Sequence, residues 1–165
     1  MRVYLPATVT LLRALNDSGL PAPATGFAAT EALRESYAVG DAEELEYAAS
    51  VHAARASLRL LDADPLAPRR RVVVVAEIAD AAVTGLAHLE PAAVRVDIAV
   101  GRAELAAVHI DGAEAEADVR AAAAATLEAE LGSDDAQFTV DAAEGHELAW
   151  YAPQELGPLL ELWPD

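Results

Sequence analysis

Residues 69–78 read Arg-Arg-Arg-Val-Val-Val-Val-Ala-Glu-Ile, with four consecutive valines at Val72–Val75. A continuous run of β-branched residues, without polar alternation, is typical of a strand that is covered on both faces. We therefore expect a strand over Arg71–Ile78 in the interior of a sheet, with a layer of structure on each side.

Two long helical patterns flank this strand. Asp41, followed three residues later by Glu44, forms a capping signal that opens a helix expected over Ala42–Leu61. A second helix is expected over Ala113–Leu131, where alanine, the best helix former, predominates. The chain is therefore predicted to be an α+β protein, with a mixed or antiparallel sheet covered by these two helices.

The order of elements from Arg71 onward predicts a ferredoxin-like second half. Strands are expected over 93–100, 106–110 and 137–140, and a short helix over 80–86. The resulting order is strand–helix–strand–strand–helix–strand. Matches at an offset of 70 residues, such as Asp41 with Asp111, suggest pseudo-repeat halves at 1–64 and 69–140. We interpret residues 1–165 as one domain, with a strand–helix extension over 141–165.

Composition excludes several classes of protein. The 165 residues include 41 alanines and carry a formal charge of −17, and all eleven basic residues are arginine. The absence of cysteine excludes disulfides and thiolate metal sites, and the absence of lysine excludes a P-loop and a Schiff-base enzyme. An acidic chain without a run of about 20 apolar residues suits neither nucleic acid nor membranes. We expect a cytoplasmic protein without a cofactor.

The only basic cluster is Arg69-Arg70-Arg71. It can form an anion site, or it can be a solvated entry to the strand that offsets nearby acids. We favour the solvated entry, because charge runs usually lie in solvent.

Two segments hold most of the chemically useful side chains. His146-Glu147 resembles the start of a zincin helix, but position 150 is tryptophan where a second histidine is required. His146 with the aromatic Trp150 and Tyr151 can form a pocket wall, or the aromatic side chains can belong to the core. His109 and Asp111 bracket a strand end and should point the same way, which offers two ligands to a metal or a histidine–carboxylate pair.

Two classes of function remain. In the first, the chain is a non-catalytic accessory or interaction module that forms a homodimer or binds a protein partner. The apolar face for this contact lies near the C-terminus and comprises Leu156, Leu159, Leu160 and Trp163. In the second, the chain is an enzyme that binds a small molecule or a metal. Its site would combine His109, Asp111, His146 and Glu147.

Four segments resemble an uncharacterised family of conserved hypothetical proteins from actinobacteria. They are residues 1–8, 45–49, 107–111 and 146–156. The resemblance implies a cytosolic protein and transfers no catalytic residue.

Overall fold

The computed structural model describes residues 1–37 and 40–163, and its centre is a seven-stranded sheet in the order β4-β5-β2-β1-β3-β6-β7. Every pair of neighbouring strands is antiparallel. The strands are β1 (Arg2–Ala7), β2 (Ala24–Phe27), β3 (Val72–Glu77), β4 (Val83–Gly85), β5 (Ala93–Val96), β6 (Leu105–Ile110) and β7 (Ala149–Tyr151). The predicted α+β class with an antiparallel sheet is confirmed.

Six α-helices and three short 3₁₀ helices surround this sheet in the described part of the chain. The α-helices are α1 (Val9–Ser18), α2 (Glu31–Ser36), α3 (Ala42–Ala63), α4 (Glu116–Glu130), α5 (Asp134–Glu144) and α6 (Leu156–Leu160). The 3₁₀ helices are η1 (Asp80–Ala82), η2 (Ala113–Ala115) and η3 (Pro153–Glu155).

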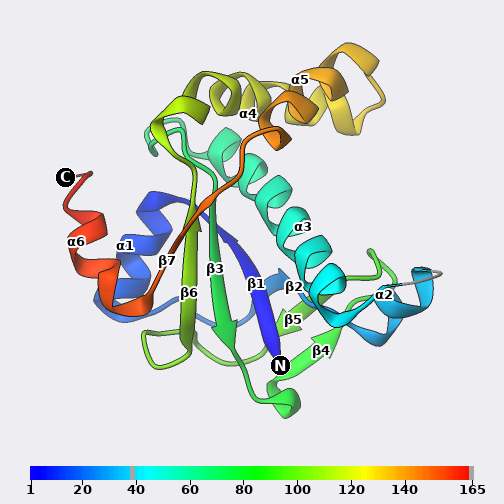
Figure 1. The fold of residues 1–165 in the computed structure, drawn as a ribbon, viewed down its shortest axis with the longest axis vertical. Helices are drawn as coiled ribbons and strands as arrows, with labels where there is room; N and C mark the ends of the chain where they lie inside the picture. The colour runs from blue at the N-terminus through cyan, green and yellow to red at the C-terminus, as the bar shows by residue number, and fades with distance from the viewer. Residues whose placement is uncertain (38–39, 164–165) are drawn as a thin grey trace.

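The valine run forms β3, which lies between β1 and β6 inside the sheet (Figure 1). Because side chains alternate along a strand, Val72 and Val74 face one hydrophobic cluster while Val73 and Val75 face another. All four valines are buried. The prediction of an interior strand covered on both faces is therefore confirmed.

Helix α3 covers one face of the sheet (Figure 1). Its side chains against the sheet include Ala49 and Ala53, which are fully buried and small enough for a close approach. Ser57 adds a polar connection, because its hydroxyl donates to the Ala7 carbonyl (2.7 Å) and accepts from the Val72 N–H (3.2 Å). This long helix is thereby fixed to both β1 and the start of β3.

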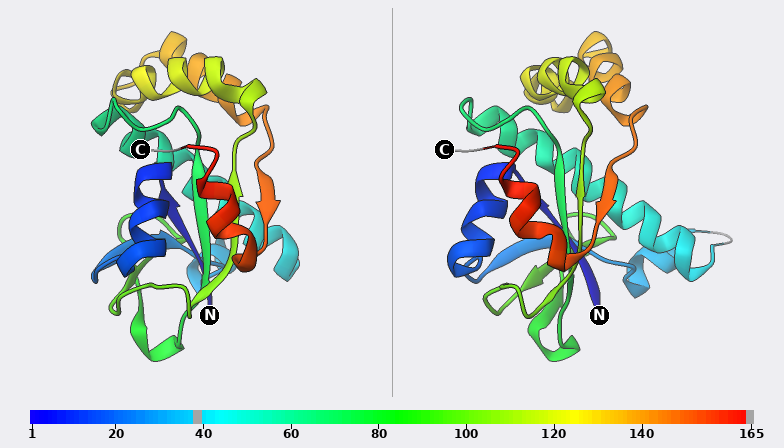
Figure 2. Two further views of the ribbon diagram at one scale, coloured as in Figure 1. Left: turned by 90° about the vertical axis from the view of Figure 1, so that its left-hand side faces the viewer. Right: turned by 60° about the vertical axis from the view of Figure 1, so that its left-hand side comes forward.

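Helices α1 and α6 lie beside each other on the opposite face (Figure 2). Leu156, Leu159 and Leu160 are at most 5% exposed and belong to the core cluster of this face, and Trp163 packs against it. The three leucines of the apolar tail therefore have no surface left for a dimer or a partner protein. Association with a partner stays a prediction.

Helices α4 and α5 form an antiparallel hairpin beyond one end of the sheet (Figure 1). The second long helix thus packs on α5 and on the end of α3 rather than on the sheet. The strand expected over 137–140 is wrong, because those residues lie within α5. The hydroxyl of Ser133 caps this helix by accepting from the Ala136 N–H (3.2 Å), and Asp134 and Asp135 suit its positive N-terminus.

The predicted ferredoxin-like order is wrong over 80–86 as well as over 137–140. The helix expected over 80–86 is the single turn η1 followed by the edge strand β4. The halves 1–64 and 69–140 stay a prediction, and the last two residues of the extension 141–165 lie outside the described part of the chain. No helix among the described residues is long and apolar enough to cross a membrane.

Candidate functional site

The site is built on a buried ion pair at the meeting point of β3 and β6. Arg71 precedes β3 and Asp111 follows β6, and the antiparallel pairing of Val72 with Ile110 brings these strand ends together. Asp111 accepts from Arg71 Nε (2.8 Å), from Nη2 (2.7 Å) and from the Arg71 backbone N–H (2.8 Å). Only 3% of the Arg71 side chain and none of the Asp111 side chain is exposed. The carboxylate therefore compensates a guanidinium that would otherwise be very costly to bury.

One nitrogen of this guanidinium remains without a partner. The Nη2 group also donates to the backbone carbonyl of His146 (2.9 Å), so Nε and Nη2 are both engaged. Arg71 Nη1 makes no hydrogen bond to the described residues. No fully enclosed side-chain nitrogen or oxygen of the described chain lacks a partner, so Nη1 must be reachable from outside. Arg71 lines a cavity, and we infer that Nη1 is the nitrogen that faces it.

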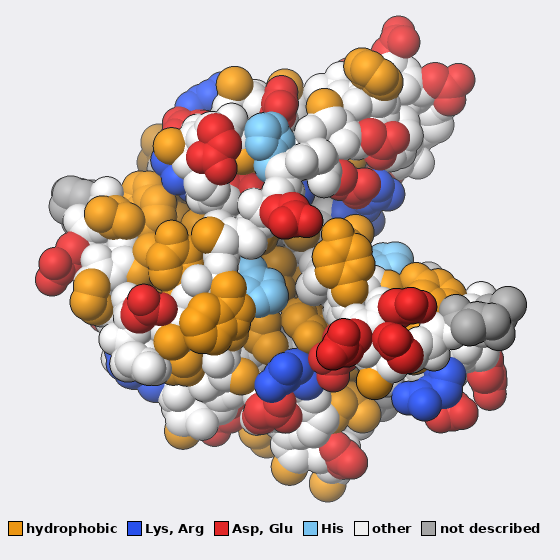
Figure 3. Space-filling model, viewed as in Figure 1, with side chains coloured by type: hydrophobic (Ala, Val, Ile, Leu, Met, Phe, Trp, Pro, Cys, Tyr) orange, Lys and Arg blue, Asp and Glu red, His pale blue; other side chains and the backbone are white. Residues whose placement is uncertain are grey.

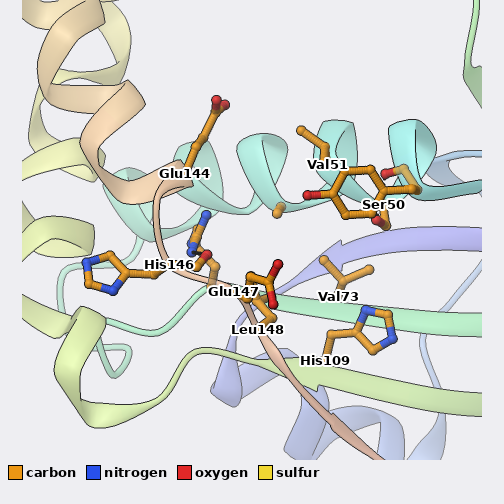
Figure 4. A pocket seen from close by; sticks show the side chains of 11 residues that line it. Ser50, Val51, Val73, His109, Glu144, His146, Glu147 and Leu148 are labelled. Atoms are coloured by element: carbon orange, nitrogen blue, oxygen red, sulfur yellow. Dashed lines mark hydrogen bonds between the residues drawn. The ribbon is translucent and has the colours of Figure 1, made fainter. Parts of the chain in front are cut away.

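The cavity lies between α3, the strands β3 and β6, and residues 144–148, which lead from α5 to β7 (Figure 4). Its volume is about 230 Å³. Residues from every bounding segment line it: Tyr47, Ser50, Val51 and Ala54 from α3, Arg71 and Val73 at β3, His109 from β6, and Glu144, His146, Glu147 and Leu148.

His109 faces the cavity because it pairs with Val73, whose side chain lies on the face covered by α3. The His109 ring makes no hydrogen bond or ion pair to any described residue. Burial lowers the pKa of His109 below its ordinary value of 6.5, because the charged ring is harder to desolvate than the neutral one. At neutral pH the ring therefore offers one donor and one acceptor to the cavity.

The adjacent residues His146 and Glu147 have different roles. The His146 Nε2 atom lies 2.7 Å from Asp118 Oδ2 on α4, and Figure 4 shows the ring directed away from His109. The Glu147 carboxylate lines the cavity and has no partner among the described residues. Glu144 also lines the cavity, but its carboxylate is paired with Arg55. Glu147 is thus the free carboxylate of this wall.

The structure brings together three of the four residues of the predicted enzyme site, since His109, His146 and Glu147 line one cavity. The fourth, Asp111, lies behind the cavity as the counter-ion of Arg71. The metal interpretation of these residues stays a prediction. In the described ranges 1–37 and 40–163, no three histidine or acidic side chains are grouped so that they could hold an ion.

The two aromatic candidates lie on opposite faces. Trp150 pairs with His109 across β6 and β7, so both side chains lie on the face of α3, where Trp150 is 61% exposed. Tyr151 packs instead against the core cluster of the other face.

Sequence reasoning considered Arg71 only within the basic cluster and did not name Tyr47 as a site residue. The solvated interpretation of the basic cluster is wrong, because Arg69 and Arg71 are 8% and 2% exposed. Arg69 donates to the Leu61 carbonyl in the last turn of α3 and to the Ala67 carbonyl in the loop that follows. Tyr47 on α3 is 65% exposed at the cavity rim. The sequence signal for the ion pair is that Arg71 and Asp111, which carry opposite charges, lie at the ends of two predicted strands.

The chain belongs to a family described as a family of unknown function (DUF6912), whose model matches residues 1–160. The expected resemblance to an uncharacterised family is confirmed, and its actinobacterial distribution stays a prediction. No curated protein and no solved structure matches the chain.

Proposed function

We propose that the chain binds a small polar molecule in the cavity between α3 and residues 144–148. The observation that carries this proposal is the Arg71 guanidinium, which is almost completely buried yet leaves Nη1 without a partner at the cavity wall. Because Nη1 is reachable from the cavity, water can accept its hydrogen bonds when no ligand is bound. An acceptor oxygen of a ligand would replace this water and keep the hydrogen bond with the charged group.

The groups around Nη1 favour a cavity that binds a ligand over a cavity that results only from imperfect packing. Two further groups with unused hydrogen-bonding capacity line the same cavity, the His109 ring and the Glu147 carboxylate. Valine, alanine and leucine side chains supply apolar walls between them. A few convergent polar groups in an otherwise apolar hollow is the usual composition of a ligand site.

The size of the cavity limits the ligand. About 230 Å³ is smaller than the roughly 300–1,000 Å³ of sites for drug-sized molecules. We therefore expect a small metabolite held by Arg71 and His109. Asp111 acts indirectly, by holding the guanidinium in place. The proposal concerns binding and assigns no reaction.

A fragment screen tests the proposal. Small neutral, cationic and anionic compounds are added to the ¹⁵N-labelled chain, and amide and side-chain shifts are followed by NMR. We expect at least one fragment to shift the signals of Val73, His109 and Leu148 together in a saturable manner. A screen in which no fragment moves these signals would refute the proposal.

Matched variants localise the binding. His109→Leu keeps a side chain of similar bulk but removes both ring nitrogens from the cavity, and should weaken the fragment at least fivefold. The control, His88→Leu, changes an exposed histidine between β4 and β5 and should leave binding unchanged. Equal affinity in both variants would show that the fragment does not occupy this cavity.

A further inference from the structure

We propose that the ligand of this cavity is a small organic cation, an ammonium compound that also carries one acceptor oxygen. This inference rests on the proposed function, and it adds the chemical class of the molecule. Three features of the described chain support it: the charge of the cavity wall, the number of donors left on Arg71, and the aromatic rings near the opening.

The charged groups of the wall leave one negative charge unbalanced. Arg71 is neutralised by Asp111, and both side chains are almost fully buried. Glu144 is neutralised by Arg55. Glu147 alone has no described partner. An anionic ligand would therefore meet repulsion from Glu147, whereas an ammonium group would pair with it.

Arg71 retains two N–H donors, but both are on Nη1 and they diverge, so they do not form the usual fork that recognises an anion. Carboxylates and phosphates are typically held by two parallel N–H bonds from one guanidinium. The Nε and Nη2 edge of Arg71 already holds Asp111, and Nη2 also holds the His146 carbonyl. Only Nη1 remains, and it suits a single oxygen, such as that of an amide, an ester or a hydroxyl.

Aromatic rings near the opening favour a cation further. Tyr47 lines the cavity and is 65% exposed, and Trp150 lies beside His109 with 61% exposure. The negative face of such rings attracts ammonium groups. Figure 3 shows large hydrophobic side chains and acidic side chains around the hollowed centre of this side of the molecule. The formal charge of −17 also attracts cations over a longer range.

Four probes that differ mainly in charge test the class of ligand. β-Alaninamide has an ammonium group and one amide oxygen, propionamide lacks the charge, succinamate carries a carboxylate instead, and inorganic phosphate is the simple anion. Dissociation constants are measured at pH 7 and low salt by NMR titration of the Val73, His109 and Leu148 signals. We expect β-alaninamide to bind at least fivefold tighter than propionamide, and both anions to leave these signals unmoved.

The Glu147→Gln variant tests the assigned carboxylate. It should reduce the advantage of β-alaninamide over propionamide to less than twofold, because only the charged probe pairs with the carboxylate. Glu128→Gln is the matched control, because Glu128 is an exposed carboxylate on α4 away from the cavity, and it should keep the full preference. A preference that survives in Glu147→Gln would overturn the role of this residue and with it the inference.

The remaining outcomes separate this inference from the proposed function. Tighter binding of succinamate or phosphate would overturn the cationic class while supporting the cavity as a binding site. If none of the four probes moves the cavity signals but another fragment does, the class is again overturned and the site stands. If no compound of either series moves them, both proposals fail.

Discussion

Replacing Asp111 with asparagine is the most direct perturbation of the buried ion pair. The amide would keep the shape of the side chain but lose its charge, which leaves the Arg71 guanidinium uncompensated. The carboxylate now receives three hydrogen bonds of 2.7–2.8 Å, and 0% of its side chain is exposed. Breaking a buried pair on one side costs about 3–5 kcal/mol, because the remaining charge stays desolvated. We expect Asp111→Asn to lower the free energy of unfolding by this amount.

Urea unfolding followed by circular dichroism measures this loss. The midpoint should fall while the slope of the free energy against urea stays unchanged, since the exposed surface is the same in both proteins. For a chain of this length, each kcal/mol shifts Tm by roughly 2–4 °C, so a decrease of about 6–20 °C is expected.

Glu130→Gln provides the control, because it breaks the pair with Arg59, and the side chains of Arg59 and Glu130 are 62% and 42% exposed. This exposed pair should contribute less than about 1 kcal/mol. A loss in Asp111→Asn no larger than in Glu130→Gln would refute the reasoning that Arg71 depends on Asp111. The double variant Arg71→Met/Asp111→Leu should be more stable than Asp111→Asn alone, because it removes both charges together.

Three further predictions concern His109, the C-terminal helix and Ser57. Burial lowers the pKa of His109, so the unfolded chain binds this proton at a higher pH than the folded chain, and stability is lost as pH falls below about 6.5. The curve of stability against pH should therefore be flatter in His109→Gln between pH 7 and 5, and superimposable curves would contradict this. Leu160→Ala, at a site 4% exposed, should cost about 2–5 kcal/mol in urea unfolding, whereas Leu162→Ala, at 67% exposure, should cost far less; equal losses would argue against a buried tail. Ser57→Ala should cost about 1–3 kcal/mol, because the Val72 N–H loses its acceptor, and faster hydrogen exchange at that amide is the readout.

The elements that sequence reasoning identified depend on local signals. The valine run specifies β3 through its unbroken β-branched, apolar character. Asp41 begins α3 through a bond that its carboxylate accepts from the Glu44 N–H (2.9 Å). The spacing of Leu156, Leu159 and Leu160 likewise indicates a buried helical face. Sequence does not say whether the covering layer is another chain or the same one. Here it is α1 of the same chain.

The error over 137–140 shows how a start signal can outweigh local propensity. Phe138, Thr139 and Val140 favour a strand by residue type, yet Phe138 is 79% exposed and only Val140 is buried. The cap at Ser133 and the two aspartates after it begin a helix that places Val140 against α4. A β-branched residue costs a helix a few tenths of a kcal/mol, which burial of one valine exceeds.

The candidate site could be predicted only in part, because its members meet through tertiary pairing. Three adjacent arginines have three different environments: Arg69 binds carbonyls at the end of α3, Arg70 lies 5.5 Å from the centre of the Trp163 ring, and Arg71 binds Asp111. The sequence Arg69-Arg70-Arg71 contains no signal that predicts these three environments. The distinction comes from the register that places Val72 opposite Ile110.

The position of Arg71 couples the fold to the cavity. Its guanidinium joins the start of β3 to the end of β6 through Asp111, and it joins both to the segment before β7 through the His146 carbonyl. The same group presents Nη1 to the cavity. A ligand oxygen on Nη1 should therefore stabilise the folded chain by mass action, and a loss of Asp111 should weaken stability and binding together. Glu147 lacks such a connection to the core, so its replacement should change ligand preference with the stability unchanged. Replacement of Asp111 and replacement of Glu147 thus distinguish the part of the site that the fold requires from the part that serves only recognition.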